Sequence, residues 1–329
     1  MLVLSKKLQL KVDYTIIIKK RRKELIVLGE QHNFSNEELK ILEKKFSKLN
    51  FIKYNEVDSK KVMNTINSYL TQKENSLIVL NTKALVSKEL LSYLITLEQK
   101  GIEYISIQSF MEKYLNKCYI PNNFSDINFL EKMKPFNKIE LFFKFLIDYT
   151  ASISLIILTS PIILYSIYKI KKESPGSIIF KQQRIGLKGK EFTCYKFRSM
   201  HENSHDDPYT RKNDNRIYPW GDFMRKTRID ELPQLINILK GDMHLIGPRA
   251  EWNRLVKDYE NQIPYYHQRH IIKPGITGWA QVNYPYGANL YDTKQKLMFD
   301  FYYIKNWNLW LEIKSIWKTI MVVLGKKGV

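Results

Sequence analysis

The sequence predicts an α/β protein with an N-terminal domain on a parallel sheet, then a membrane helix, then an α+β domain. Three observations support this prediction. Apolar β-type runs alternate with helical patterns early in the chain, a long stretch without any charge follows, and a strand hairpin precedes further helical periodicity. Alternation of strands and helices is typical of a parallel sheet covered by helices. The expected boundaries are 1–120 for the first domain, 121–138 for a linker, 139–172 for the membrane helix and 173–329 for the second domain.

Composition narrows the classes of protein to which the chain can belong. It has 329 residues, enough for two domains, and 44% of them are hydrophobic, enough for packed cores. The net charge of +20 favours polyanionic partners such as nucleic acid, anionic lipid or phosphorylated substrates. Cys118 and Cys194 lie far apart and fit no metal-ligand pattern, so we expect no disulfide and a reducing compartment. The first apolar run is too short for a signal peptide.

The first domain consists of β-type runs separated by helical patterns. The runs are YTIII (14–18), ELIVLG (24–29), FIKY (51–54), SLIVL (76–80) and IEYISI (102–107), and the helical patterns cover 35–48, 58–71 and 87–100. Gly29 ends the second run, but no G-x-G-x-x-G turn follows it. Because that turn is what lets the backbone approach a pyrophosphate, its absence favours a scaffolding or regulatory domain over a dinucleotide-binding one.

The segment YTASISLIILTSPIILYSIY (149–168) carries no charge and approaches the length of a bilayer-crossing helix. Pro161, preceded by Ser160, falls mid-segment, where proline bends a helix and a serine can bond the freed carbonyl. Lysines flank both ends, and the positive-inside rule places both ends on the cytoplasmic side. A re-entrant helix-break-helix meets both demands, but a spanning helix and a buried core helix stay open on these features alone. The flanking lysines are Lys138, Lys144, Lys169, Lys171 and Lys172.

A hairpin rich in basic residues follows the uncharged segment. The runs SIIF (177–180) and EFTCYKF (191–197) read as two strands joined by a turn around Gly186 and Gly189. The basic residues are either a solvated charged face or a surface for phosphate or lipid headgroups. They are Lys181, Arg184, Lys188, Lys190, Lys196 and Arg198.

Asp230 and Glu231 stand side by side in RIDELPQLINILKGDMHLIGPR (228–249). Apolar residues at helical spacing follow them up to Gly241, and Pro233 suits the first helical turn. One interpretation is structural, with Asp230 as the helix cap and Glu231 as a first-turn stabiliser. The chemical interpretation gives one carboxylate to a divalent metal and leaves the other free as a nucleophile. Arginines would then offset the charge of the carboxylates beside a substrate phosphate, and the nearby ones are Arg225, Arg228 and Arg249.

Three weaker candidates remain. His201 and His205 have metal-ligand spacing next to Asp206 and Asp207, although the polar composition there also fits a loop. Asp242 either supports the site or belongs to a turn. The tail 299–324 is rich in Trp and Tyr, which indicates a membrane interface or ordinary packing.

Four motifs together show a resemblance to a known family. They are SP within the uncharged segment, SPGSIIFKQQRIGLKGKEFTCYKFRSM, RIDELPQLINILKGDMHLIGPR and KPGITGWAQVNYPYG, in that order. Over about 140–329 the chain resembles the bacterial sugar transferases known as monotopic phosphoglycosyl transferases, and its ending is similar to their exopolysaccharide branch. The first domain resembles the Rossmann-like accessory domain of the longer members. Ala250 after GPR and Arg228 before the carboxylate pair depart from the family pattern and leave the sugar pocket uncertain.

The resemblance implies roles for individual residues. Asp230 would attack the β-phosphate of a UDP-sugar, and Glu231 would bind Mg²⁺. Polyprenyl phosphate would then take the sugar phosphate from the enzyme. The substrate phosphates would contact Arg249, Arg225, Lys196 and Arg198, the nucleotide would lie beside Thr277 and Gly278, and the re-entrant helix would break at Ser160 and Pro161.

The resemblance also implies partners and a location. They are a UDP-sugar, polyprenyl (undecaprenyl) phosphate and membrane lipid, at the cytoplasmic face of the bacterial plasma membrane. No recognisable nucleic-acid module is present, so nucleic acid is not expected, and the oligomeric state, a homodimer included, stays open. Two other hypotheses are a metal-dependent glycosyltransferase that uses Asp206 and Asp207 and releases UDP, and a non-enzymatic membrane adaptor suggested by the net charge alone.

Overall fold

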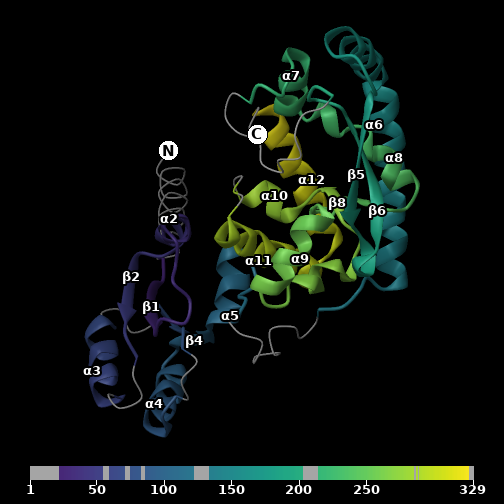
Figure 1. Cartoon of the computed structure of the whole chain (residues 1–329). Helices are drawn as coiled ribbons and strands as arrows, with labels where there is room; N and C mark the ends of the chain where they lie inside the picture. The colour runs from purple at the N-terminus through teal and green to yellow at the C-terminus, as the bar shows by residue number, and fades with distance from the viewer. Residues whose placement is uncertain are drawn as a thin grey trace, which may run out of the picture. The chain divides into compact units, whose positions relative to one another are not determined.

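The computed structural model forms two compact units, Met1–Asn116 and Lys117–Val329 (Figure 1). The structure describes residues 22–54, 59–70, 75–82, 86–121, 133–202, 214–284, 287 and 289–325. The predicted strand at 14–18 and the candidate metal residues His205, Asp206 and Asp207 lie outside the described residues.

The first unit contains a parallel sheet of four strands in the order β2-β1-β3-β4. The strands are β1 (Glu24–Leu28), β2 (Lys48–Ile52), β3 (Ser76–Leu80) and β4 (Glu103–Ser106). All five residues of the central strand β1 are buried. A strand covered on both faces favours apolar residues at successive positions, which explains the apolar run LIVL (25–28) after Glu24.

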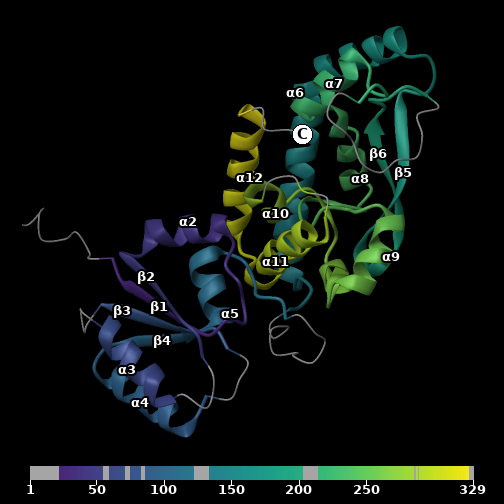
Figure 2. The ribbon, with the colours of Figure 1, turned by 60° about the vertical axis from the view of Figure 1, so that its left-hand side comes forward.

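Helices cover both faces of this sheet. They are α2 (Asn36–Lys45), α3 (Ser59–Tyr69), α4 (Lys88–Gln99), α5 (Ile107–Phe110) and a π-helical turn at Met111–Leu115. Val62, Ile66, Leu90 and Leu94 of α3 and α4 pack on one face, and α2 and α5 lie on the other (Figure 2). The prediction of a parallel sheet with covering helices is therefore confirmed.

Gly29 has a packing role at the end of β1. Its φ is +98°, and a Cβ atom there would come within 2.4 Å of the backbone oxygen of Asn81. The Asn81 side chain donates to the oxygens of Gly29 and His32, at 3.1 and 2.9 Å. The glycine therefore allows two strand ends to approach closely, and the asparagine bridges them.

The second unit is a mixture of helices and short strands around one long helix. The predicted hairpin is present as an antiparallel pair, β5 with β6, and β7 pairs with β8 in parallel. The elements are α6 (Lys138–Glu173), β5 (Ile179–Ile185), β6 (Glu191–Phe197), α7 (Pro219–Thr227), α8 (Gln234–Leu239), β7 (His244–Ile246), α9 (Asn253–Gln262), β8 (Gly275–Thr277), α10 (Trp279–Asn283), α11 (Leu290–Asn306) and α12 (Leu309–Leu324).

The helix α6 is continuous from Lys138 to Glu173 and contains Ser160 and Pro161, the residues at which the sequence predicts a break. The proline frees the carbonyl of Ile157, and the Ser160 hydroxyl donates to that oxygen at 2.8 Å. Because the carbonyl keeps a partner, the helix continues through the proline, and its ribbon changes direction in its second half (Figures 1 and 2). Among the described residues, α6 alone is long and apolar enough to cross a bilayer, and only 11% of its most apolar window is buried.

Lys144 does not flank a membrane segment as the sequence suggested. Its side chain is completely buried, and its ammonium lies 2.7 Å from Glu312 of α12. The sequence could not distinguish a lysine that faces the lipid interface from one that faces the protein, because both stand beside the same apolar run. Lys138 thus remains the exposed lysine at the start of α6.

Candidate active site

The carboxylate pair lies in a short 3-10 turn, Ile229–Glu231, between α7 and α8. Arg228 enters this turn with a left-handed backbone, at φ 61°. The helix α8 starts only at Gln234, after Pro233, and neither α8 nor the turn has a side-chain cap. The interpretation of Asp230 as a helix cap is therefore wrong, and capping does not explain why two carboxylates stand there.

Apolar neighbours fix the position of the turn. Ile229 and Leu232, which flank the carboxylates, pack against a core that includes Ile163 and Ile167 of α6. That core also contains buried residues of β6 and α7, namely Phe197, Tyr218 and Met224. The carboxylate pair is thus held against the second half of the apolar helix.

Glu231 lies within a ring of cations. Its Oε1 atom accepts from the Lys196 ammonium at 2.7 Å and lies 3.7 Å from Arg249 and 3.9 Å from Arg228. Burial alone would raise the pKa of this carboxyl, but Lys196, Arg249 and Arg228 hold it well below its usual range. Glu231 is therefore ionised at every physiological pH.

Asp230 has a different environment from its neighbour. It is 8% exposed, and its Oδ1 atom is buried without a hydrogen-bond partner. Burial, and then the negative charge of Glu231, raise the pKa of Asp230 to about 6. An unpaired buried carboxylate oxygen costs free energy, and a perturbed pKa of this kind is typical of reactive groups.

The segment Gly247–Arg249, here the GPR loop, is held by backbone contacts with residues 275–278. Gly247 donates to the oxygen of Thr277, and Gly275 to that of Pro248, each at 2.9 Å. A Cβ atom on Gly278 would come within 2.1 Å of the Gly247 oxygen, so only glycine allows this approach. Thr277 and Gly278 thus support the loop that carries Arg249, and the Thr277 hydroxyl contacts Thr319 at 3.0 Å.

A small cavity beside Glu231 joins the hairpin to the GPR loop. Lys196 and Arg249 line it together with Arg184 and Gln234, for which no individual role was predicted from the sequence. The alternation along β6 puts Cys194 and Lys196 on one face, a signal that could have located this wall from the sequence. The remaining lining residues are Cys194, Ala250, Gly275 and Ile276. All three charged residues of the lining are cationic, which suits an anionic ligand.

One predicted phosphate ligand, Arg198, has its guanidinium bonded within the protein. Three guanidinium nitrogens of Arg198 donate to Ser174 and Ser177, at 2.6 to 2.8 Å, so this side chain fixes the loop before β5. Arg225, in the last turn of α7, acts on Asp230 through its charge and lowers the pKa of that carboxyl. Ser160 and Pro161 lie within α6.

The remaining candidates, His201 and Asp242, contact neighbouring side chains of the protein. His201 contacts the Ser174 hydroxyl at 3.2 Å, and Asp242 accepts from Asn237 at 3.1 Å. Asn237 in turn bonds the backbone of β6, so Asp242 supports the junction of α8 with the hairpin. Cys118 and Cys194 are both buried.

The carboxylates of Asp230 and Glu231 fit a magnesium ion that takes only one or two of its ligands from the protein. Mg²⁺ is usually bound through one or two carboxylates together with substrate phosphates and water. Glu231 is ionised, and Asp230 adds a buried oxygen without a partner. In the described part of the chain, no group of three His, Cys, Asp or Glu side chains could hold a metal. A metal here would therefore depend on the substrate for its remaining ligands.

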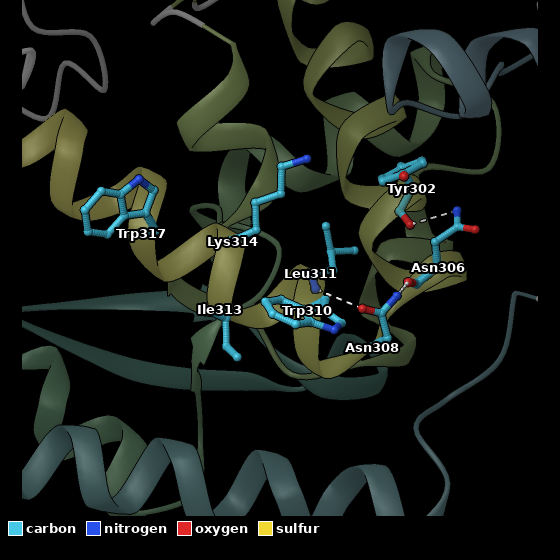
Figure 3. Close-up of a pocket in the computed structure, with 8 residues that line it drawn as sticks. All are labelled: Tyr302, Asn306, Asn308, Trp310, Leu311, Ile313, Lys314 and Trp317. Carbon is cyan, nitrogen blue, oxygen red and sulfur yellow. Dashed lines mark hydrogen bonds between the residues drawn. The ribbon is translucent and has the colours of Figure 1, made fainter. Parts of the chain in front are cut away.

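A groove of about 580 Å³ lies on α11 and α12 (Figure 3), and neither Asp230 nor Glu231 lines it. Trp310 is 80% exposed and Trp317 62%. Amide, lysine and aromatic side chains share this wall, and they are Tyr302, Asn306, Asn308, Trp310, Leu311, Ile313, Lys314 and Trp317. Such a mixture suits a boundary between water and lipid better than an enclosed substrate site.

Comparison with known proteins gives a consistent result. The sequence model of a family described as Bacterial sugar transferase matches residues 139–326. The chain is 47% identical over 183 residues to a UDP-N-acetylgalactosamine-undecaprenyl-phosphate N-acetylgalactosaminephosphotransferase of Aeromonas hydrophila (55% of this chain, 43% of that protein). It is 45% identical over 174 residues to a UDP-glucose:undecaprenyl-phosphate glucose-1-phosphate transferase of Xanthomonas campestris pv. campestris (51% and 36%).

A shorter relative is covered more fully. The chain is 41% identical over 190 residues to the uncharacterized sugar transferase EpsL of Bacillus subtilis, with 56% of this chain and 89% of EpsL matched. By contrast, the match covers less than half the length of the two transferases from Aeromonas and Xanthomonas. The shared region corresponds to the second unit, which contains the carboxylate pair.

Proposed function

The chain belongs to the bacterial sugar transferase family, and on that premise we propose that it transfers a sugar 1-phosphate from a UDP-sugar to undecaprenyl phosphate and releases UMP. The single observation that carries the proposal is the asymmetry of the carboxylate pair. Glu231 is ionised and surrounded by cations, whereas Asp230 is buried with an unpaired oxygen and a pKa raised to about 6. Two adjacent carboxylates with such different environments suit two different roles.

In the first step Asp230 acts as the nucleophile. One of its carboxylate oxygens attacks the β-phosphorus of the UDP-sugar, and the bond from that phosphorus to the bridging oxygen breaks. The bridging oxygen leaves with UMP, and the sugar phosphate remains on Asp230 as an acyl phosphate. Burial strips water from the nucleophile, while its pKa near 6 keeps most of it ionised at neutral pH.

In the second step the polyprenyl phosphate takes the sugar phosphate from the enzyme. A phosphate oxygen of the lipid attacks the same phosphorus, the bond to Asp230 breaks, and the carboxylate is regenerated. Phosphoryl transfer depends chiefly on positioning and charge neutralisation. Lys196 and Arg249 supply fixed positive charge at the cavity beside Glu231. When held by Glu231 and the substrate phosphates, Mg²⁺ would neutralise further negative charge.

The location we propose is the cytoplasmic face of the plasma membrane. The apolar face of α6 is exposed at Phe142, Ile157, Leu158 and Leu164, and lipid is the environment that suits it. With both ends of α6 basic and a bend in its second half, we favour a helix that enters one leaflet and returns. On α12, Trp310 and Trp317 beside Lys314 fit a helix at the lipid interface.

The first unit is proposed to be a Rossmann-like accessory domain. Its parallel sheet has helices on both faces. Asn81, however, packs against Gly29 in the turn after β1 and donates to the oxygen of that glycine. This arrangement supports a scaffolding or regulatory role. A homodimer is a further proposal, which a measurement of molar mass in detergent would test.

The experiment is an analysis of the nucleotide released by the membrane-bound protein. We expect UMP on incubation with undecaprenyl phosphate and one donor from a panel of UDP-glucose, UDP-galactose and their N-acetylated forms. Asp230→Asn should release none. The control is Asp222→Asn, an exposed aspartate of α7 that pairs with Lys226, and it should retain full turnover.

Other products would point to other functions. Release of UDP would favour a glycosyltransferase that transfers the sugar alone. An intact mass of the protein incubated with donor alone should rise by the mass of the sugar phosphate, and Asp230→Asn should not show this rise. Turnover to lipid-linked sugar without any such adduct would exclude the covalent route.

A further inference from the structure

Lys144 and Asp148 form a buried polar cluster in the first half of α6. Lys144 is fully buried and Asp148 is 3% exposed, one helical turn apart on the same face. The apolar residues Phe142 and Phe145 on other faces of this segment are exposed. Buried charges cost free energy unless they are paired and hydrogen-bonded, so the partners of these two residues indicate what the cluster does.

Lys144 and Asp148 both bond to residues of β7. The Lys144 ammonium donates to the oxygen of Ile246 at 2.8 Å. Asp148 accepts from the Leu245 amide at 2.8 Å through one oxygen and lies 2.5 Å from His244 Nδ1 through the other. Among the described strands, β7 pairs only with β8. Side chains of α6 therefore bond β7 in place of a further strand.

A residue on α12 completes the cluster. Glu312 is fully buried, lies 2.7 Å from the Lys144 ammonium and accepts from Tyr303 at 2.6 Å and from Trp307 at 2.9 Å. The Tyr303 hydroxyl also lies 3.1 Å from the Ile246 oxygen, so its single proton is shared between that carbonyl and Glu312. The oxygen of Ile246 thus lies within hydrogen-bond distance of side chains from two helices, α6 and α11.

Ile246 is followed directly by the GPR loop, and Arg249 is three residues further on. On the premise of the proposed function, we infer that Lys144, Asp148 and Glu312 are positioning residues. They hold the loop so that Arg249 meets the substrate phosphates. They touch neither carboxylate of the catalytic pair. Their effect passes through β7, since Arg249 Nη1 lies 3.7 Å from Glu231 only while the loop keeps its place.

A double-mutant cycle tests the inference. Lys144→Met alone would leave the buried Glu312 carboxylate without its cation and destabilise the fold. The variant is therefore Lys144→Met combined with Glu312→Gln. We expect KM for the UDP-sugar to rise on the order of 10–100-fold with a smaller change in kcat. In an Arg249→Lys background the same pair should cost much less, because the loop no longer carries the guanidinium that it positions.

The matched control is Lys117→Met, which removes another buried lysine of the same unit, bonded to Gln295 at 2.7 Å. It should cost the same with and without Arg249→Lys. Additive effects of the Lys144 and Glu312 changes with Arg249→Lys would show a merely structural role and overturn the inference. Asp148→Asn, which can still accept from the Leu245 amide, should restore most of the affinity lost in Asp148→Ala.

Hydrogen exchange separates this inference from the proposed function. In Asp148→Ala, the amide of Leu245 and the peptide that contains the GPR loop should exchange faster, while α9 (Asn253–Gln262) should not change. This readout needs no substrate. Unchanged exchange at 244–249 would overturn the positioning role even if UMP is released, and faster exchange would support it even if no donor in the panel is used.

Discussion

Asp230→Asn is expected to abolish turnover and, at the same time, to stabilise the protein above pH 6. Folding buries this carboxyl beside Glu231 and raises its pKa from 3.8 to about 6. The folded state therefore holds the proton more tightly than the unfolded state. By linkage, the stability contributed by this group is highest at low pH and falls as the pH rises from about 4 to about 6.

The size of the effect follows from the same change in pKa. A rise from 3.8 to about 6 corresponds to a loss of about 3 kcal/mol above pH 6, and to roughly half of that at pH 5. Asparagine carries no charge and escapes this cost, although its amide group still requires partners. For a unit of this size, we expect Tm to rise by up to about 6–12 °C at pH 8.

The assay is thermal unfolding in detergent at pH 5, 6, 7 and 8. Asp222→Asn, on the exposed surface of α7, serves as the control and should shift Tm only slightly at any pH. A Tm gap for Asp230→Asn that is negative, or that does not grow from pH 5 to pH 8, would refute the reasoning. It would mean that burial beside Glu231 does not strain the folded state.

Four further predictions concern other parts of the second unit. In the donor-only half-reaction, the rate of UMP release should rise with pH through a midpoint near 6. Lys196→Met should move that midpoint up by about one pH unit, because the charge of Lys196 lowers the pKa of Asp230. Stopped-flow or quench measurements from pH 5 to 8 would check this. Gly278→Ala should destabilise the protein by about 1–3 kcal/mol in urea unfolding, since its Cβ would meet a backbone oxygen of the GPR loop at 2.1 Å. Trp310→Gln should weaken binding to vesicles of anionic lipid roughly tenfold in a sedimentation assay, because its exposed ring would lose its burial in the interface. Ser160→Ala should lower Tm in lipid nanodiscs by the equivalent of about 1–3 kcal/mol, because it leaves the proline-freed carbonyl without a donor; Thr159→Val, which removes a hydroxyl from an ordinary helical carbonyl, should change it little.

Much of the fold followed from periodicity. The strand-helix alternation, the hairpin of β5 and β6, and the long apolar helix all result from local spacing of side chains, which a single sequence displays directly. Arg249 also lies near the carboxylate pair, 3.7 Å from Glu231. Local patterns predicted these features because the residues that define each one are close in sequence.

The features that the sequence missed depend on distant partners. Lys144 reads as a flanking lysine until its partner Glu312, 168 positions away, is placed beside it. Asp230 reads as a cap until the backbone shows that α8 starts later. Arg184 and Gln234 join the cavity only because the hairpin folds against the GPR loop. In each case the chemistry depends on a contact that no spacing rule reports.

The buried charges on α6 also answer a problem that its composition creates. An apolar helix against an apolar core gains nearly the same free energy from burial after a rotation or a shift of one turn, so packing alone specifies its register poorly. Buried polar groups are weak evidence for stability, but they can specify one arrangement over others. Lys144 and Asp148 can meet the oxygen of Ile246 and the amide of Leu245 in one register only. Ile163, Ile167 and Ile170 in the second half of α6 belong to the same packing cluster as Ile229 and Leu232 beside the carboxylates. One helix therefore packs near the carboxylate pair and also bonds the strand that leads to Arg249, so under the proposed function a slip of that helix would separate the nucleophile from the guanidinium.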